Sequence, residues 1–423
     1  MSGPGRTSQQ PSPTPIVALV GHDSAGTGAV LLTLLEVAGM TGESADSGIG
    51  QRASVDRRRQ TSPALPFASI AYDGIAVTLV DTSAPPGAAD MRPAGLRAAD
   101  AALFVVSAVD GIDAATIALW EWCAQVELPR AVLISKLDQP RVDFDESVAV
   151  CQRVFGDGIL PLYFPVHADD GTPAALIGLL SQQLSDYSGS YDSGSDYSGS
   201  YDSGVFPPVV REPDPEHLRL IEQVRNDLVE AIAAEAEDTA LVDRYLAGEA
   251  IDTYALAQEL TAAVAHGALF PVLPFVAGTG LAVGAAELLE LVTSAFPAAQ
   301  EHLLPAVQHL DGRPYDLTVG DAAGPLVAAV LWTGQDASLG GLTLLRTYAG
   351  TIRAGAHVHV AAPGTTGPDG TVQSVGRVYH LLGSTPTPTD RCSAGLVCVV
   401  TGLIGSPAGA TLSDPDLPLV ITA

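Results

Sequence analysis

A glycine-rich turn, Gly21-His22-Asp23-Ser24-Ala25-Gly26-Thr27-Gly28, lies between an apolar run and an expected helix. Its spacing is that of GxxxxGK[ST], where backbone N–H groups surround phosphates, the lysine reaches the outer phosphates and the Ser or Thr binds Mg²⁺. Thr27 stands at the lysine position and Gly28 at the hydroxyl position, and a lost charge-assisted contact costs about 1.5–3 kcal/mol. The turn is either a weakened phosphate cradle or a tight turn without a ligand. The candidate binding residues are Gly21, Asp23, Ser24, Ala25, Gly26, Thr27 and Gly28.

A carboxylate, Asp81, ends a later apolar run and begins the sequence Asp-Thr-Ser-Ala. In P-loop hydrolases an Asp-x-x-Gly segment at this place acts on Mg²⁺ through its Asp and contacts the terminal phosphate through its Gly. Ala84 replaces that glycine, and Pro85-Pro86 restrict the following backbone. Asp81 therefore remains a candidate nucleotide-binding residue, and we assign neither a metal ligand nor a catalytic residue.

A third cluster, Ser135-Lys136-Leu137-Asp138, follows the apolar run 131–134. It resembles the guanine-reading sequence Asn-Lys-x-Asp, whose Asp accepts the base N–H groups and whose Lys stem lies over the ring. Ser135 replaces the Asn, while Lys136 and Asp138 are kept. A Lys and an Asp at this spacing also occur by chance, but three such clusters in this order, each ending a strand-like run, together indicate a nucleotide site.

Short apolar runs alternate with helical patterns from residue 16 to about 295, which predicts a doubly wound α/β domain over 15–295. The runs lack in-and-out alternation, as expected for parallel strands buried on both faces. The expected strands are Ile16–Val20, Ile75–Val80, Ala102–Ser107, Ala131–Ser135 and Pro271–Val276. The expected helices are Ala29–Ala38, Ala114–Gln125, Glu146–Phe155 and Ala285–Ala295.

The segment 156–265 interrupts this alternation as an insertion. It contains a tandem repeat, SDYSGSYDSG at 185–194 and again at 195–204, whose composition predicts a mobile surface loop, followed by a helical subdomain. We expect a disordered tail at 1–14, a linker at 296–314 and a small antiparallel β-barrel at 315–423. The barrel prediction rests on apolar runs such as Leu326–Leu331, Leu342–Tyr348, Val358–Ala361, Val375–His380 and Leu396–Val400.

The charge of the chain limits its partners. Against 48 Asp and Glu there are 20 Lys and Arg, of which Lys136 is the one lysine, and the net charge is −28. A uniform negative field repels nucleic acid, so we expect no DNA partner.

The cysteines and the apolar runs bear on localisation. The four cysteines form no CxxC pair, as expected for a protein of the reducing cytosol. No apolar run approaches the roughly 18 residues of a membrane span. We therefore expect a cytoplasmic protein without a membrane partner.

Beyond the three motifs, the chain resembles the first two domains of elongation factor G, and most of all the divergent elongation factor G-like proteins of actinobacteria. The resemblance implies a Ras-like P-loop GTPase domain with an inserted helical subdomain, followed by a translation-factor β-barrel. It also implies GTP or GDP with Mg²⁺ as cofactors and the ribosome as partner. Segments that carry it include AYDGIAVTLVDT (71–82), AGLRAADAALFVVSAVDGIDAAT (94–116), PRAVLISKLDQPRVDFDE (129–146), LRTYAGTIRAG (345–355) and GATLSDPDLPL (409–419).

Family residues are replaced at further positions. The threonine that binds Mg²⁺ aligns near Ala64, the catalytic histidine with Pro85, and the base-contacting serine loop with 276–278, which lacks the serine. The three later family domains are missing from the sequence, which disfavours translocation. We therefore expect a truncated, degenerate member, with weak or lost nucleotide binding, at the factor site of the ribosome. The alternatives are a nucleotide-free interaction scaffold, a relic without function, and a GTP-binding elongation factor with low GTPase activity.

Overall fold

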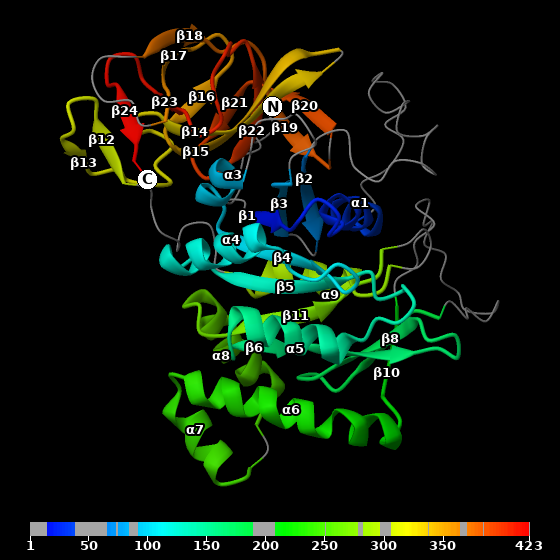
Figure 1. Ribbon diagram of the computed structural model, residues 1–423. Coiled ribbons are helices and arrows are strands. Elements are labelled where there is room, and N and C mark those ends of the chain that lie inside the picture. Colours follow the sequence, from blue (N-terminus) through cyan, green and yellow to red (C-terminus); the bar gives the residue numbers. More distant parts are fainter. Residues whose placement is uncertain are drawn as a thin grey trace, which may run out of the picture.

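The computed structural model describes residues 15–38, 66–72, 75–83, 92–188, 208–249, 251–277, 282–296, 306–336, 338–363, 370–383 and 385–422. The expected tail, most of the tandem repeat and the positions Ala64, Ala84, Pro85 and Gly278 lie outside these residues. The chain forms an α/β domain with a barrel at one side and a helical insertion at the other (Figure 1).

The α/β domain is built on a seven-stranded sheet in the order β2-β3-β1-β4-β5-β11-β6. All neighbours in it are parallel except β2 and β3, which form an antiparallel pair. The carboxyl ends of β1, β3, β4 and β5 therefore lie at one edge, where ligands bind in such sheets. The strands are β1 (Ile16–Val20), β2 (Phe67–Tyr72), β3 (Ile75–Asp81), β4 (Ala101–Ser107), β5 (Arg130–Ser135), β6 (Ile159–Pro161) and β11 (Phe270–Pro274).

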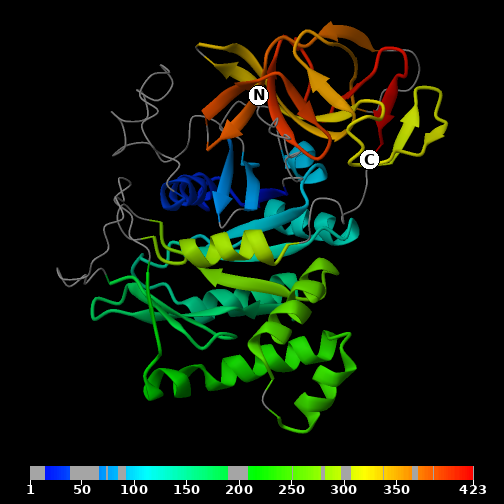
Figure 2. The same ribbon diagram turned by 180° about the vertical axis from the view of Figure 1, so that it is seen from behind.

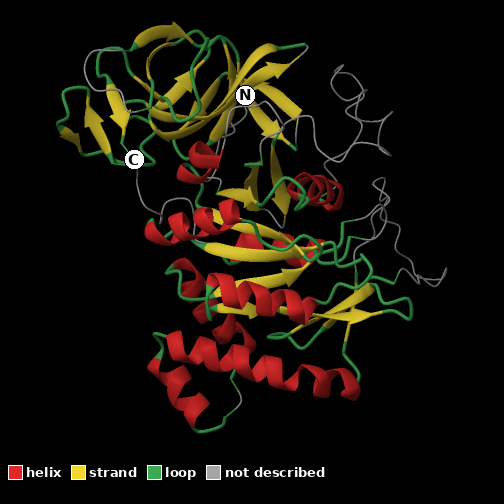
Figure 3. Cartoon of the chain, viewed as in Figure 1, coloured by secondary structure: helices red, strands yellow, loops and turns green. Residues whose placement is uncertain are grey.

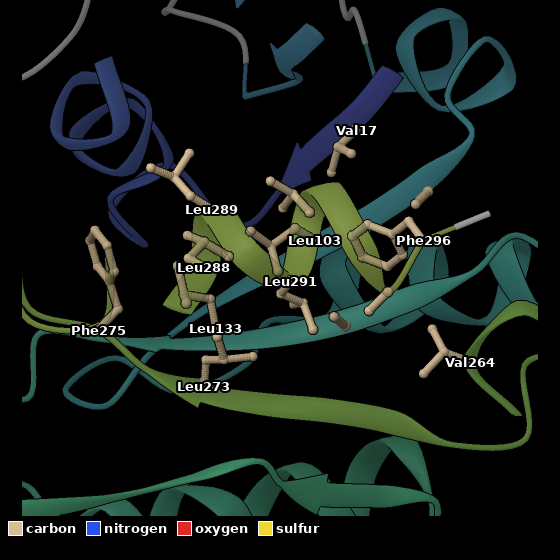
Figure 4. Packing of buried hydrophobic residues seen from close by; sticks show 14 of the residues in the cluster. Val17, Leu103, Leu133, Val264, Leu273, Phe275, Leu288, Leu289, Leu291 and Phe296 are labelled. Carbon is tan, nitrogen blue, oxygen red and sulfur yellow. The ribbon is translucent and has the colours of Figure 1, made fainter. Parts of the chain in front are cut away.

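Helices cover both faces of this sheet because its strands are apolar on both sides. In β1, Val17 and Leu19 join one buried cluster, with α1 (Thr27–Val37) and α9 (Ala285–Ser294), while Ile16, Ala18 and Val20 join the other, with α3 (Arg92–Arg97), α4 (Ala114–Gln125) and α5 (Phe144–Phe155). Figure 4 shows Leu288 and Leu291 of α9 over the strand residues Leu103, Leu133 and Leu273. This packing fixes the loops at the carboxyl edge. The expected α/β domain is confirmed.

The insertion contains more than the expected helices. A four-stranded antiparallel sheet, in the order β10-β9-β8-β7, comes before the helical part and contains β7 (Tyr163–His167), β8 (Pro173–Gly178), β9 (Leu184–Asp186) and β10 (Val209–Arg211). The helices that follow are α6 (Pro215–Glu235), α7 (Thr239–Leu246) and α8 (Thr253–Ala265). Figure 3 shows these helices at the end of the molecule far from the barrel.

The tandem repeat begins inside ordered structure, which corrects the expectation of a surface loop over all of 185–204. Ser185 and Asp186 belong to β9, and Tyr187 is buried, with its hydroxyl donating a hydrogen bond to the Glu287 carboxylate of α9. A tyrosine of low-complexity composition can thus be a core residue when its hydroxyl finds a buried partner. Residues 189–204 of the repeat lie outside the described part.

The C-terminal domain is the predicted antiparallel barrel (Figure 2). An eight-stranded sheet, in the order β18-β17-β23-β14-β15-β22-β19-β20, and the pair β16-β21 form it, while β12, β13 and β24 make a separate small sheet. Part of the expected linker is therefore strand, because β12 pairs with β24. The strands are β12 (Val307–His309), β13 (Pro314–Tyr315), β14 (Val327–Asp336), β15 (Gly340–Ala349), β16 (Thr351–Arg353), β17 (His357–Ala361), β18 (Thr371–Ser374), β19 (Val378–Leu382), β20 (Thr385–Thr389), β21 (Arg391–Ser393), β22 (Val397–Thr401), β23 (Thr411–Ser413) and β24 (Leu419–Ile421).

The barrel packs tightly on the α/β domain. Arg346 of β15 donates from Nη2 to Asp100 Oδ1 at 2.6 Å and from Nη1 to the Ala98 carbonyl at 2.5 Å. The second Asp100 oxygen accepts the Ile16 N–H at 2.8 Å, so this carboxylate joins both domains. Trp332 of β14 meets the ring of Phe67 edge-on, with centroids 5.3 Å apart.

Candidate nucleotide site

The glycine-rich turn forms a compact loop between β1 and α1. The Ala25 N–H donates to the His22 carbonyl at 2.8 Å, and Gly26 precedes the helix with φ 94°, a left-handed conformation that favours glycine. In the part of the chain that the structure describes, no protein group accepts the N–H groups of Gly26, Thr27 or Gly28. Such N–H groups at a helix start are the backbone donors that a phosphate cradle would need.

Thr27, at the lysine position of the motif, and Ser83 surround Asp81 with hydroxyl groups. The Thr27 hydroxyl lies 2.7 Å from the Ser83 hydroxyl, which donates to Asp81 Oδ1 at 2.5 Å. The Ser83 N–H donates to the same oxygen at 3.0 Å. Burial raises the pKa of Asp81, while the hydrogen bonds from Ser83 and Thr27 act in the opposite direction. Asp81 is therefore bound to neutral donors, and among the described residues no cation lies beside it.

The third cluster, Ser135–Asp138, contains an ion pair. Lys136, at φ 61°, donates from Nζ to Asp110 Oδ2 at 2.7 Å, and the Ser107 and Ser24 hydroxyls donate to the same oxygen at 2.8 and 3.3 Å. These partners, Lys136 first, lower the pKa of Asp110. The Lys136 amine is thus engaged with a carboxylate of the β4 loop.

Ser135 connects the Ser135–Asp138 cluster to the glycine-rich turn. Its hydroxyl donates to the Ala25 carbonyl at 2.7 Å and lies 3.3 Å from the Val106 carbonyl. Asp138 is exposed and accepts a bond from Gln139 at 2.9 Å. The structure therefore brings Ser24, Ala25, Ser135 and Lys136 into one network, whereas Asp138 lies in the same loop without a contact to it among the described residues.

Two residues of these contacts, Ser83 beside Asp81 and Asp110 beside Lys136, were not among the residues expected from the sequence. A signal for each was present: Ser83 follows Asp81 by two residues, where a Ser side chain bonds back to an Asp. Asp110 lies three residues after the end of β4, at the same sheet edge as the other loops. The serine-free loop at 276–278 follows β11, and Val276 is buried there.

One Mg²⁺ ligand of the GxxxxGK[ST] motif is replaced in the glycine-rich turn. Among the described residues, no group of three or more His, Cys, Asp or Glu is placed to hold a metal ion. Mg²⁺ in nucleotide sites needs carboxylate or hydroxyl oxygens that complete an octahedron with water and phosphate. Here Asp81 already accepts two bonds at Oδ1, and Gly28 offers no oxygen in its side chain. Among the described residues, the turn thus lacks the side-chain hydroxyl that holds Mg²⁺ in the GxxxxGK[ST] motif.

Comparisons with known proteins agree with the fold. The model of the elongation factor Tu GTP binding domain matches residues 12–298, more than half of the 423 residues. The elongation factor G-like protein of Mycobacterium tuberculosis is 41% identical over 377 residues, which cover 86% of this chain and 49% of the relative. Elongation factor G of Mycoplasma genitalium is 25% identical over 362 residues, covering 84% of this chain and 48% of that protein. The chain thus spans about half the length of these curated relatives.

A solved structure supports the same conclusion. A crystal structure of a protein from Thermus thermophilus matches with a TM-score of 0.68 at 25% identity, covering 96% of this chain and 55% of the other. The chain therefore belongs to the translational GTPase family, whose members share the elongation factor Tu GTP-binding domain. Within that family it is elongation factor G-like, as predicted from its sequence. No helix in the described ranges is long and apolar enough to cross a membrane.

Proposed function

We propose that this chain is a degenerate elongation factor G-like protein that binds guanine nucleotide weakly or not at all and does not hydrolyse GTP. The observation that carries the proposal is the hydroxyl chain from Thr27 through Ser83 to Asp81. Hydrolysis needs a held metal, a neutralised outer phosphate and an ordered water. The hydroxyl chain supplies no positive charge, so the outer phosphates and the developing charge would stay uncompensated.

Residual affinity would come from groups that this chain keeps. The N–H groups at the start of α1 would bind a phosphate, and Asp138 would accept the N–H groups of guanine. The Lys136 amine is paired with Asp110, so it would offer a bound nucleotide little additional positive charge. A cytoplasmic role at the factor site of the ribosome, as implied for elongation factor G relatives, belongs to the same proposal.

Titration with fluorescent GDP and GTP, with and without Mg²⁺, tests the nucleotide part. We expect dissociation constants near or above the millimolar range and no dependence on Mg²⁺. Micromolar, Mg²⁺-dependent binding would instead support the alternative of a GTP-binding elongation factor with low activity. Cosedimentation with ribosomes tests the partner, since a nucleotide-free scaffold or a relic would stay in the supernatant.

A restored variant sharpens this test. Thr27→Lys with Gly28→Thr returns the charge and the metal hydroxyl, and should strengthen GTP binding about 10- to 100-fold, because a charge-assisted hydrogen bond contributes about 1.5–3 kcal/mol. Ala118→Lys, at an exposed position of α4, makes the same change in net charge and should leave binding unchanged. Equal binding by the two variants, both folded by circular dichroism, would contradict the assignment of the phosphate site.

A further inference from the structure

Two of the four cysteines lie side by side in the interior of the barrel. Cys392 of β21 and Cys398 of β22 are both 0% exposed and belong to the same buried apolar cluster. Their side chains form a hydrogen bond with each other, and both are free cysteines. Two thiols are therefore held in contact in the barrel without a covalent bond between them.

The sheet register explains why the two sulfur atoms meet. Cys398 lies opposite Leu345 of β15, and Cys392 Sγ lies 3.6 Å from the Thr347 hydroxyl oxygen, two residues further along the same strand. Residues two apart on a strand point to the same face of the sheet. Both cysteines are therefore on the face of β15 that forms the barrel core, and the fold itself places them together.

The other two cysteines provide a contrast. Cys123 of α4 and Cys151 of α5 are also 0% exposed, but in the part of the chain that the structure describes neither has a hydrogen bond to another thiol. A buried thiol on its own is inert, because the thiolate is the nucleophile and burial suppresses the thiolate. Two thiols in contact can instead form a disulfide with each other once one of them has reacted.

Strand β21 gives a route by which a reagent can reach the pair. It has three residues, Arg391–Ser393, of which Arg391 is exposed, and among the described strands it pairs with β16 alone. Segments with few buried contacts open locally at a lower free energy than core strands. Local opening therefore exposes Cys392 first, while Cys398 stays in β22, between β15 and β19 of the eight-stranded sheet.

We propose that Cys392 and Cys398 are a redox site that forms a reversible disulfide on reaction with a low-molecular-weight disulfide. The Cys392 thiolate attacks one sulfur of the oxidant, which releases a first thiol and leaves a mixed disulfide on Cys392. Cys398 then attacks the Cys392 sulfur and releases a second thiol. The two cysteine protons end on the two released thiols, and the oxidant gains the two electrons that the cysteines lose. The new bond ties β21 to β22.

Incubation of the native protein with oxidised glutathione tests this, followed by alkylation in urea, trypsin digestion and mass spectrometry. Trypsin cleaves after Arg391, and the peptide that begins at Cys392 contains both thiols. We expect this peptide to lose two hydrogen atoms and to escape alkylation, and dithiothreitol should reverse both changes. Cys123 and Cys151 should be alkylated as in the untreated protein.

Two variants separate the two steps of the reaction. Cys398→Ala leaves Cys392 without a second thiol, so the glutathione adduct on Cys392 should be at least about 10-fold more abundant than in the parent chain. Cys151→Ala removes a thiol that is equally buried and should leave oxidation of the peptide that begins at Cys392 unchanged. Circular dichroism checks that each variant is folded, and the measurement on the parent chain needs neither variant.

Three results would overturn the proposal. The first is a peptide with Cys392 and Cys398 still fully reduced after prolonged incubation of the native protein. The second is equal oxidation of all four cysteines, and the third is an equal amount of the Cys392 adduct in the parent chain and in Cys398→Ala. Nucleotide binding enters none of these measurements, so their outcome is independent of the proposed function.

Discussion

The ion pair between the barrel and the α/β domain offers a sharp test of how the two domains are held together. Arg346 is 8% exposed and Asp100 is 2% exposed, so neither charge can be hydrated when the other is removed. Arg346→Met keeps most of the side-chain stem and removes two hydrogen bonds, at 2.5 and 2.6 Å. The Asp100 carboxylate then keeps the Ile16 N–H as its partner in a buried site.

The expected loss of stability follows from these contacts. Two hydrogen bonds that involve a charged group contribute about 1.5–3 kcal/mol each, and breaking a buried ion pair costs about 3–5 kcal/mol in other proteins. Arg346→Met should therefore lower the free energy of unfolding by about 3–5 kcal/mol. Adding Asp100→Asn removes the buried charge, so the double variant should lose less than about 2 kcal/mol.

Urea unfolding, followed by tryptophan fluorescence and far-UV circular dichroism, measures both values. Trp332 packs against Phe67 across the domain contact, so its emission reports separation of the domains. Arg353→Met, at an exposed position of β16, is the matched control and should change stability by less than about 0.5 kcal/mol. A single variant within about 1 kcal/mol of the parent chain, which is the error of such comparisons, or a double variant as unstable as the single one, would refute the reasoning.

Three other predictions concern buried groups. Tyr187→Phe removes the donor to the buried Glu287 carboxyl and should cost about 1–3 kcal/mol in urea unfolding. Burial raises the pKa of Asp81 above its ordinary 3.8, so the ionised form destabilises the folded state. Asp81→Asn should therefore raise the unfolding free energy at pH 7, and this gain should shrink as the pH falls toward 3.8. Burial also raises the pKa of Cys123 and of Cys151 to about 12, so both thiols should react slowly with a thiol reagent at pH 8 until urea unfolds the chain.

Each of these has a result that would contradict it. A Tyr187 variant as stable as Tyr254→Phe, at a residue that is 69% exposed, would show that the start of the repeat does not contribute to the core. A gain for the Asp81 variant that grows toward low pH would reverse the sign of the pKa shift. Rapid reaction of all four thiols in the native protein would be incompatible with their burial.

The buried strands of the α/β domain were predictable because a strand buried on both faces has a continuous apolar sequence. β1 has the predicted bounds Ile16–Val20, and α4 has the predicted bounds Ala114–Gln125. The β-sheet of the insertion was missed, because its strands are short and Tyr187 is packed by a partner 100 residues away. Local composition cannot reveal such a contact.

The same limit applies to the candidate site. The residues at the strand ends were identified from spacing, since parallel strands bring their carboxyl ends together. The contact of Thr27 with Ser83, 56 residues apart, and that of Ser24 with Asp110, 86 residues apart, depend on rotamers and loop geometry. The motifs therefore point to a candidate site, and the structure was needed to find which side chains lie beside Thr27, at the position where the motif has its lysine.

The single lysine makes one side chain of these 423 residues selectively reactive toward amine reagents. Lys136 is the one lysine among 423 residues, and its side chain is 32% exposed in the loop that follows β5. Among these 423 residues, any reagent or enzyme that acts on lysine amines, such as an acylating label or an acetyltransferase, meets one side chain. Acylation there would remove the charge that pairs with Asp110. One covalent modification would therefore report on, and alter, the loop after β5 in the candidate site without changing any other side chain of the described chain.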